Sequence, residues 1–144
     1  MAPQFPEETP HGGDLVFAYG TLKRGGQYHH LIEQIGARFI GPGQLVIPYP
    51  LYLARYPCLL DQPGSGLGVR GEVFRVHDPE DWKVLDQLED HPFEYKRRVE
   101  PVWVKGERLS AWTYFYQEPD KIDPDLIPVE EFPIDPGPGS DDAV

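Results

Sequence analysis

The chain has 144 residues and a single cysteine, so it is long enough for one domain with a buried core and cannot form an internal disulfide. Its 17 prolines and 15 glycines predict many turns, short helices and a majority of strands. The formal net charge of −11 argues against nucleic-acid binding, and no apolar run is long enough to cross a membrane. The lone cysteine and an acidic start unlike a signal peptide favour a cytoplasmic location.

Most of the acidity lies in the C-terminal segment. Residues 118–144 hold nine acidic residues, six prolines and one lysine. Apolar residues are nevertheless spaced through 122–134, so we expect part of this tail to pack along the body, with the end from Pro136 free. The predicted organisation is a disordered leader at 1–13, a compact domain at 14–117 and the acidic, Pro-rich tail at 118–144. The protein partner of that tail, if it has one, stays unknown.

Strands dominate the predicted elements. In chain order these are a strand at 15–19, a helix at 27–35, a strand at 37–47 interrupted by Gly-Pro-Gly, a strand at 51–54, a strand at 66–76, a helix at 78–88, and a hairpin of strands at 94–105 and 107–117. With about six strands to two helices, we predict an α+β fold. Its centre is a small mixed, mostly antiparallel β-barrel with flanking short helices.

Three consecutive basic residues, at 96–98, lie between Glu94 and Glu100. Because acidic residues flank them on both sides, we interpret this cluster as a solvated strand edge. It adds no basic surface for nucleic acid.

The first predicted strand ends in a loop that can bind an anion. The apolar run from Val16 breaks at Gly20, and a helix-compatible run follows from about Gln27. Such a transition leaves backbone N–H groups without partners, and these groups can cradle a carboxylate. The same pattern is also typical of an ordinary tight turn, so both interpretations stay open at this point.

The second predicted helix places a carboxylate on its apolar side. At about 100° per residue, Glu89 falls between Leu85 and Trp82 inside the apolar arc. An inward glutamate costs several kcal/mol unless it is partnered or protonated. It can act as a general acid/base with a raised pKa, or it can serve structure by capping or by pairing with an arginine. The candidate arginines are Arg24, Arg38 and Arg70.

Other candidate groups favour structural roles. Glu72 is the rival base, but Arg70 lies two positions away on the same strand face and favours a structural pair. Cys58 lies among apolar neighbours and is interpreted as a small buried group. The five histidines lack ligand spacing, so we expect no metal site.

Together these features resemble the gamma-glutamyl cyclotransferase-like superfamily. The resemblance rests on an apolar strand running into Tyr19-Gly20-Thr21-Leu22, then Leu85-Asp86-Gln87-Leu88-Glu89, then Tyr95-Lys96-Arg97. Two further segments between them match in order, Gly41-Pro42-Gly43 and Gly71-Glu72-Val73-Phe74. The stretches at 49–51 and 63–66 look most like the gamma-glutamylamine cyclotransferase branch. The resemblance spans 16 to about 116 and leaves only the leader and the tail outside.

The resemblance implies cleavage of a gamma-glutamyl amide, in which the α-amine of the substrate attacks its own γ-carbonyl to give 5-oxoproline and a free amine. It implies Glu89 as the general acid/base and no cofactor. Substrate binding falls to Tyr19, Gly20, Thr21 and Leu22, whose backbone N–H groups would meet the α-carboxylate or the oxyanion. Tyr95 and Tyr116 would supply pocket-wall donors, although a strand tyrosine is often core or rim.

Three alternatives remain open from the sequence. The leaving group could be an amino acid, in which case the pocket should present a cation to its carboxylate. The fold could serve a non-catalytic module that binds a small ligand or a partner. The apolar spacing at 122–134 could also let the tail cover and gate the pocket.

Overall fold

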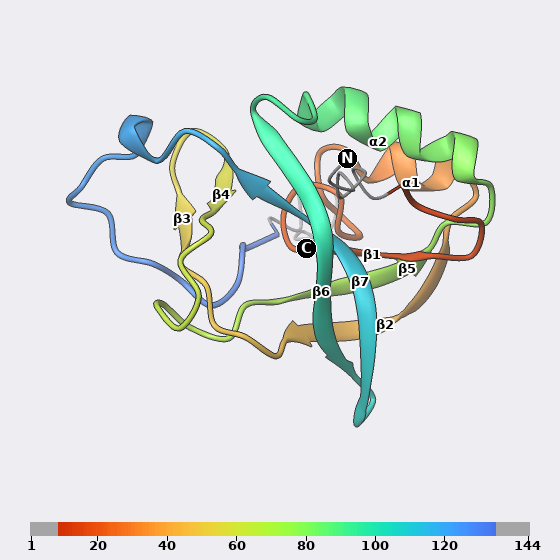
Figure 1. The fold of residues 1–144 in the computed structure, drawn as a ribbon, viewed down its shortest axis with the longest axis horizontal. Helices are drawn as coiled ribbons and strands as arrows, with labels where there is room; N and C mark the ends of the chain where they lie inside the picture. Colours follow the sequence, from red (N-terminus) through yellow and green to blue (C-terminus); the bar gives the residue numbers. More distant parts are fainter. Residues whose placement is uncertain (1–8, 135–144) are drawn as a thin grey trace, which may run out of the picture.

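The computed structural model describes residues 9–134 and contains a closed β-barrel (Figure 1). Its strands, in their order around the barrel, are β1 (Leu15–Ala18), β5 (Arg70–Arg75), β2 (Arg38–Leu45), β6 (Tyr95–Val104) and β7 (Glu107–Tyr116). All neighbours pair antiparallel except β1 and β7, whose parallel contact closes the barrel. The predicted mixed, mostly antiparallel barrel is confirmed.

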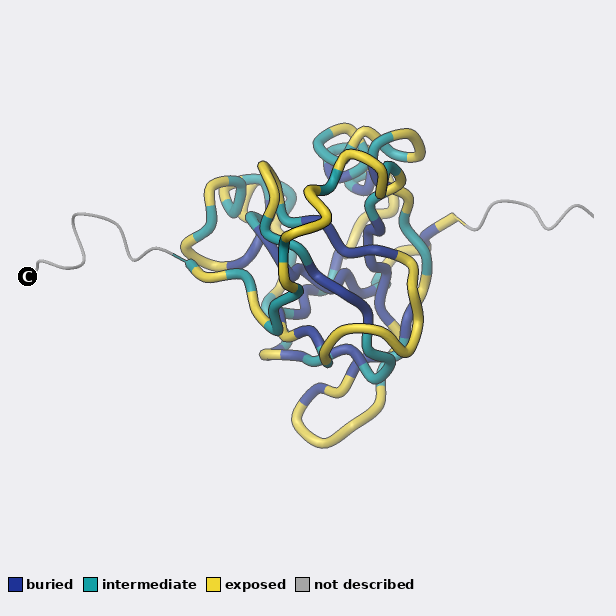
Figure 2. The backbone as a smooth tube through the Cα atoms, turned by 90° about the vertical axis from the view of Figure 1, so that its left-hand side faces the viewer, coloured by how far each residue is buried: buried dark blue, intermediate teal, exposed yellow. Residues whose placement is uncertain are grey.

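Two short helices flank the barrel on one side (Figure 1). They are α1 (His29–Gln34) and α2 (Trp82–Glu89), and a 3₁₀ turn at Pro79–Asp81 leads into α2. The Asp78 side chain caps this turn by accepting the Glu80 backbone N–H at 2.9 Å, as expected of an Asp-Pro helix start. One apolar cluster fills the barrel, and a second joins the barrel to the helices. Figure 2 shows the buried stretches gathered in the middle, with exposed loops around them.

A two-stranded sheet outside the barrel was not predicted in full. It pairs β3 (Leu51–Leu53) with β4 (Pro57–Leu59) in antiparallel register. Only β3 was expected, because β4 is three residues long, begins with proline and shows no alternation. The strand predicted at 66–76 is also shorter, since β5 begins only at Arg70 and 66–69 contain a single isolated bridge, from Leu67 to Tyr49. At Gly66, φ is +81° and a Cβ would lie 2.6 Å from the Pro50 backbone, so the chain cannot extend there.

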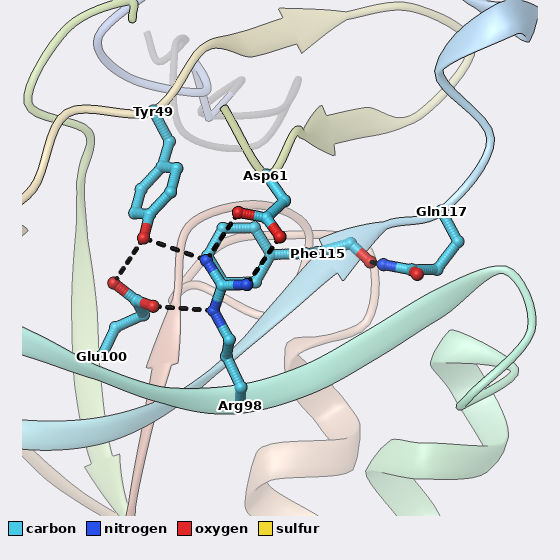
Figure 3. Close-up of polar contacts among 6 residues, drawn as sticks. All are labelled: Tyr49, Asp61, Arg98, Glu100, Phe115 and Gln117. Carbon is cyan, nitrogen blue, oxygen red and sulfur yellow. Dashed lines mark hydrogen bonds and ion pairs between the residues drawn. The ribbon is translucent and has the colours of Figure 1, made fainter. Parts of the chain in front are cut away.

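A partly buried ion network ties this outer sheet to the barrel (Figure 3). From β6, Arg98 donates from Nη1 and Nη2 to the two carboxylate oxygens of Asp61, at 2.7 and 2.8 Å, just beyond β4. Its Nε donates to Glu100 Oε2 at 2.8 Å, and Nη2 also donates to Tyr49 Oη at 2.9 Å. The Tyr49 hydroxyl donates to Glu100 Oε1 at 2.9 Å, so both glutamate oxygens are satisfied. The predicted strand edge holds at Arg98, since this stretch of β6 pairs only with β7 and the Arg98 side chain is 39% exposed. The prediction of a fully solvated cation is wrong, because Asp61, Glu100 and Tyr49 bind the guanidinium.

Replacing Arg98 by methionine is expected to lower the free energy of unfolding by about 3 kcal/mol, because Glu100, 5% exposed, would keep a buried charge without its cation. Urea denaturation measures this loss. Arg108→Met, at an exposed position on the β6–β7 turn, is the control and should change stability by less than about 0.5 kcal/mol. Equal stability of the two variants would contradict a structural role for the network.

The segment after β7 lies along the body. It passes a 3₁₀ turn at Pro119–Lys121, and Val129 N–H then donates to Leu51 O of β3 at 2.8 Å. Farther on, Glu130 O accepts the Arg70 N–H at 2.8 Å, and Phe132 O accepts Lys23 Nζ at 2.6 Å. The segment thus links the outer sheet, β5 and the loop after β1. The end expected to be free from Pro136 lies outside the described residues.

Before β1, the Gly13 N–H donates to Val76 O at 2.9 Å and the His11 N–H to Asp14 Oδ2 at 2.8 Å. The predicted disordered leader covers 1–13, and its first eight residues lie outside the described part of the chain. Within 9–134, no helix combines the length and apolarity needed to span a membrane.

Candidate active site

A pocket of about 170 Å³ opens where the chain leaves the barrel at the end of β1. Its lining combines segments that are distant in sequence, namely 17–22, Tyr28, 56–57, 88–89, 94–95 and Tyr114. The barrel therefore supplies one wall, the end of α2 another, and the outer sheet a third. This lining brings together Glu89, the Tyr19–Leu22 segment and Tyr95, which the sequence analysis singled out separately.

The loop after β1 presents backbone N–H groups without partners. Gly20 O accepts the Lys23 N–H at 3.1 Å, and Thr21 O accepts the Tyr28 N–H at 2.9 Å, so the carbonyls are used in turns. The N–H groups of Gly20, Thr21 and Leu22 donate to no other residue in the described part of the chain. The turn therefore uses the backbone carbonyls of the loop as acceptors and leaves its N–H donors beside the pocket, an arrangement that suits an anion.

The loop is too tight for side chains at its glycines. A Cβ on Gly20 would lie 2.6 Å from Pro57 Cγ, and one on Gly26 would lie 2.3 Å from Thr21 O. Both distances are below any van der Waals contact. The absence of side chains lets β4 close against the loop and lets the loop fold back on itself.

Two of the predicted tyrosines have their hydroxyl protons engaged in the wall. Tyr19 is buried, and its hydroxyl donates to Tyr114 O at 2.7 Å. The Tyr95 hydroxyl donates to Pro57 O at 2.8 Å and thereby holds β4 against β6. Tyr116 packs its ring against that of Tyr95, with centroids 5.3 Å apart, and is not among the lining residues. In this structure these rings shape the pocket.

Glu89 is the last residue of α2, and its half-buried side chain lines the pocket. Its carboxyl forms no hydrogen bond or ion pair with any residue in 9–134. Two arginines considered as its partners pair elsewhere, Arg24 with Glu72 and Arg70 with Glu130, at 3.2 and 3.6 Å. Glu72, the rival base, also accepts the Arg24 backbone N–H at 2.8 Å and lies in a surface pair. Its partner is Arg24, not the expected Arg70.

Burial, together with the smaller effects of the negative charges of Glu94 and Asp86, raises the pKa of Glu89 from 4.5 to about 8. A carboxyl with such a pKa exchanges its proton near neutral pH. It can therefore accept a proton from one group and give it to another within a single turnover.

Sequence reasoning missed the group that supports this helix end. The Oδ1 atom of Asp86 accepts the Tyr114 hydroxyl at 2.6 Å and Arg97 Nε at 2.8 Å. Arg97 Nη2 completes a bidentate pair with Oδ2 at 2.9 Å, and the Arg97 side chain is only 9% exposed. The expected solvation of the basic cluster is wrong here too. The signal lay in the matched segments at 85–89 and 95–97, which contain both partners.

A sequence model of the family described as "Gamma-glutamyl cyclotransferase, AIG2-like" matches residues 16–133. The chain belongs to this gamma-glutamyl cyclotransferase family. It is 40% identical over 115 residues to a putative gamma-glutamylcyclotransferase of Drosophila melanogaster, covering 74% of this chain and 73% of that protein. It is 41% identical over 104 residues to the Homo sapiens gamma-glutamylaminecyclotransferase, covering 67% of each.

The fold agrees with that family. The crystal structure of an AIG2-like protein from Mus musculus superposes with a TM-score of 0.77 at 32% identity, covering 90% of this chain and 94% of that one. The predicted superfamily, and within it the gamma-glutamylamine cyclotransferase branch, are confirmed. Family members therefore share both the barrel and the stretch that contains the pocket, since the match runs from β1 to the segment after β7.

Proposed function

We propose that this protein cleaves gamma-glutamyl amides by attack of the substrate's α-amine on its own γ-carbonyl, releasing 5-oxoproline and a free amine. The observation that carries the proposal is Glu89, a carboxyl without a protein partner in the same pocket as three backbone N–H groups without partners. Such a pair of features supplies a proton shuttle and an anion site, which are the two things this reaction needs.

A single carboxyl can carry out the proton transfers that the reaction requires. Ionised Glu89 takes a proton from the substrate α-ammonium, and the free amine then forms the new C–N bond of a five-membered ring. The negative charge that develops on the γ-carbonyl oxygen is met by N–H groups of the loop at 20–22. Protonated Glu89 then gives its proton to the leaving nitrogen as the original amide bond breaks. The carboxylate formed in this way takes the second proton from the ring nitrogen, and that proton passes to the released amine. Because nucleophile and electrophile belong to one molecule, no enzyme nucleophile is required.

We further propose a preference for gamma-glutamylamines over gamma-glutamyl amino acids. No lysine, arginine or histidine is among the lining residues of the pocket in 9–134, so the carboxylate of an amino-acid leaving group would find no cation there. The names of relatives such as the human gamma-glutamylaminecyclotransferase agree with this preference.

Release of 5-oxoproline from gamma-glutamyl-ε-lysine and from gamma-glutamyl-alanine tests both proposals. We expect turnover of the first to exceed that of the second. Faster turnover of gamma-glutamyl-alanine would favour the amino-acid alternative. Absence of 5-oxoproline from both, with folded protein, would favour a module that only binds.

The pH dependence of kcat/KM should report Glu89. Because the base form is required, kcat/KM should rise with pH through the pKa of about 8. Glu94→Gln removes a neighbouring negative charge, lowers the pKa of Glu89 and should move this limb to lower pH by about 0.5 to 1 pH unit. Glu107→Gln, at the exposed far end of the β6–β7 hairpin, is the control and should leave the limb in place. If kcat/KM rose at the same pH in the wild type and in both variants, the assignment of this limb to Glu89 would be contradicted.

A further inference from the structure

The pocket contains a second carboxylate that the proposed reaction does not use. Glu94 directly precedes β6 and lines the pocket together with Glu89. Its backbone is fixed on both sides: its N–H donates to Asp90 O at 3.0 Å, and its O accepts the Gln117 N–H at 2.9 Å. Its side chain, by contrast, forms no hydrogen bond or ion pair with any residue of 9–134. A half-buried carboxylate on a fixed backbone without a protein partner is available to a ligand.

The charge of Glu94 reaches two walls of the pocket. It raises the pKa of Glu89 on α2, after burial, and it adds to the raised pKa of the Cys58 thiol on β4. On the outer side of the pocket the charge of Glu94 also raises the pKa of Lys121, but the Lys121 ammonium is bound to Glu118 Oε1 at 2.5 Å. The lining itself contributes no cation, so the negative charge of Glu94 is not neutralised inside the pocket.

The remaining lining suits a positive charge. Five tyrosines, at positions 19, 28, 56, 95 and 114, contribute to the pocket, and the faces of aromatic rings attract cations. A negatively charged group would meet two carboxyls and no counterion. Carboxylate and rings together therefore discriminate by charge.

The reaction leaves one part of the substrate for Glu94 to recognise. The loop at 20–22 accounts for the α-carboxylate or the oxyanion, and Glu89 accounts for the α-amine. A second carboxylate bound to the α-ammonium would stabilise the protonated form and oppose the attack, because only the free amine is nucleophilic. The α-carboxylate and the oxyanion are both negative and would be repelled by Glu94, so the leaving amine is the part of the substrate left for Glu94 to recognise.

We propose that Glu94 selects gamma-glutamyl amides whose leaving amine carries a second, positively charged amine, that is, gamma-glutamyl derivatives of diamines. This inference rests on the proposed function and specifies its substrate class. The bonds made and broken are unchanged: the α-nitrogen bonds to the γ-carbon, the amide C–N bond breaks, and the two protons lost by the α-ammonium end on the released amine. Glu94 acts on specificity, not on the chemical step.

Two substrates that differ by one ammonium group test the inference, the gamma-glutamyl amides of 1,4-diaminobutane and of 1-aminobutane. For the wild type we expect kcat/KM to be about fivefold to tenfold higher for the diamine derivative. In Glu94→Gln this ratio should fall to near unity when each protein is measured at its plateau pH. Glu107→Gln should keep the wild-type ratio, since it lies at the opposite end of a hairpin of 10-residue strands.

Inhibition of the wild type by the free amines gives a readout that needs no variant, and 1,4-diaminobutane should inhibit more strongly than 1-aminobutane. A ratio that stays the same in Glu94→Gln would overturn the inference. So would an equal loss for both substrates, which would place Glu94 on the glutamyl part. If the wild type released 5-oxoproline from neither amide nor from gamma-glutamyl-ε-lysine, the proposed function itself would fail, and this inference with it.

Discussion

Glu89→Gln is expected to fold and to release 5-oxoproline at least about 1,000-fold more slowly than the wild type. Glutamine keeps the size of the side chain and can neither accept the proton of the α-ammonium nor deliver one to the leaving nitrogen. Since the Glu89 carboxyl forms no hydrogen bond or ion pair with residues 9–134, the substitution removes no structural contact. Initial rates of 5-oxoproline formation under substrate saturation measure the effect.

Glu72→Gln is the matched control because Glu72 is the other candidate base from the sequence. It pairs with Arg24 at the surface, and its substitution should change turnover by less than about threefold. If Glu72→Gln abolished turnover and Glu89→Gln did not, the roles assigned to the two carboxyls would be reversed.

Glu89→Gln should also be more stable than the wild type at alkaline pH. The pKa of Glu89 is about 8 in the folded protein and 4.5 as its ordinary value, so the folded state binds the extra proton between these pH values. Stability of the wild type therefore falls as pH rises through this window, and glutamine abolishes that loss. With allowance for partial exposure, Glu89→Gln should unfold with about 1–3 kcal/mol more free energy near pH 8 and with no gain near pH 4. Thermal or urea unfolding at both pH values tests this, and an equal gain at both would contradict the raised pKa.

Gly20→Ala is expected to reduce kcat/KM by about 100-fold. The added Cβ would lie 2.6 Å from Pro57 Cγ and 3.2 Å from Pro57 Cβ, so the loop after β1 and the outer sheet must separate. This movement shifts the N–H groups of the loop away from the substrate position that the barrel and α2 define. Steady-state kinetics measure the loss.

A double variant gives the control for Gly20→Ala. Pro57→Ala removes the atom nearest to the new Cβ, so Gly20→Ala/Pro57→Ala should recover at least about tenfold of the lost kcat/KM. Pro57→Ala alone should have a small effect, because the Pro57 carbonyl that accepts the Tyr95 hydroxyl remains. If the losses in kcat/KM of the two single variants simply added in the double variant, the close contact between the new Cβ and Pro57 would not be the cause of the loss in Gly20→Ala.

The sequence predicted the parts of this protein that depend on local pattern. The alternation of Trp112, Tyr114 and Tyr116 on one face and the turn at Gly106 were enough for the β6–β7 hairpin, and the Asp78-Pro79 start was enough for the turn that leads into α2. The inward position of Glu89 also followed from helix geometry, because its place in the apolar arc is a local property. Elements of this kind need no knowledge of distant contacts.

The features that were missed depend on contacts between distant segments. The Asp86 carboxylate looks solvent-facing in its own helix, and only the closed barrel brings Arg97 and Tyr114 to it. Arg98 likewise reaches Asp61 across 37 positions of the chain. Glu94 was noticed only as a flanking acid, because its place in the pocket is set by the turn between α2 and β6. Ionic partners across a barrel leave no periodic signal in one sequence.

The most direct test of the central claim is the identity of the products from gamma-glutamyl-ε-lysine, measured by mass spectrometry in water enriched in heavy oxygen. We predict equal amounts of 5-oxoproline and lysine, with no solvent oxygen in the 5-oxoproline, because the α-nitrogen and not water attacks the γ-carbonyl. Glutamate carrying solvent oxygen would instead show hydrolysis and contradict the account.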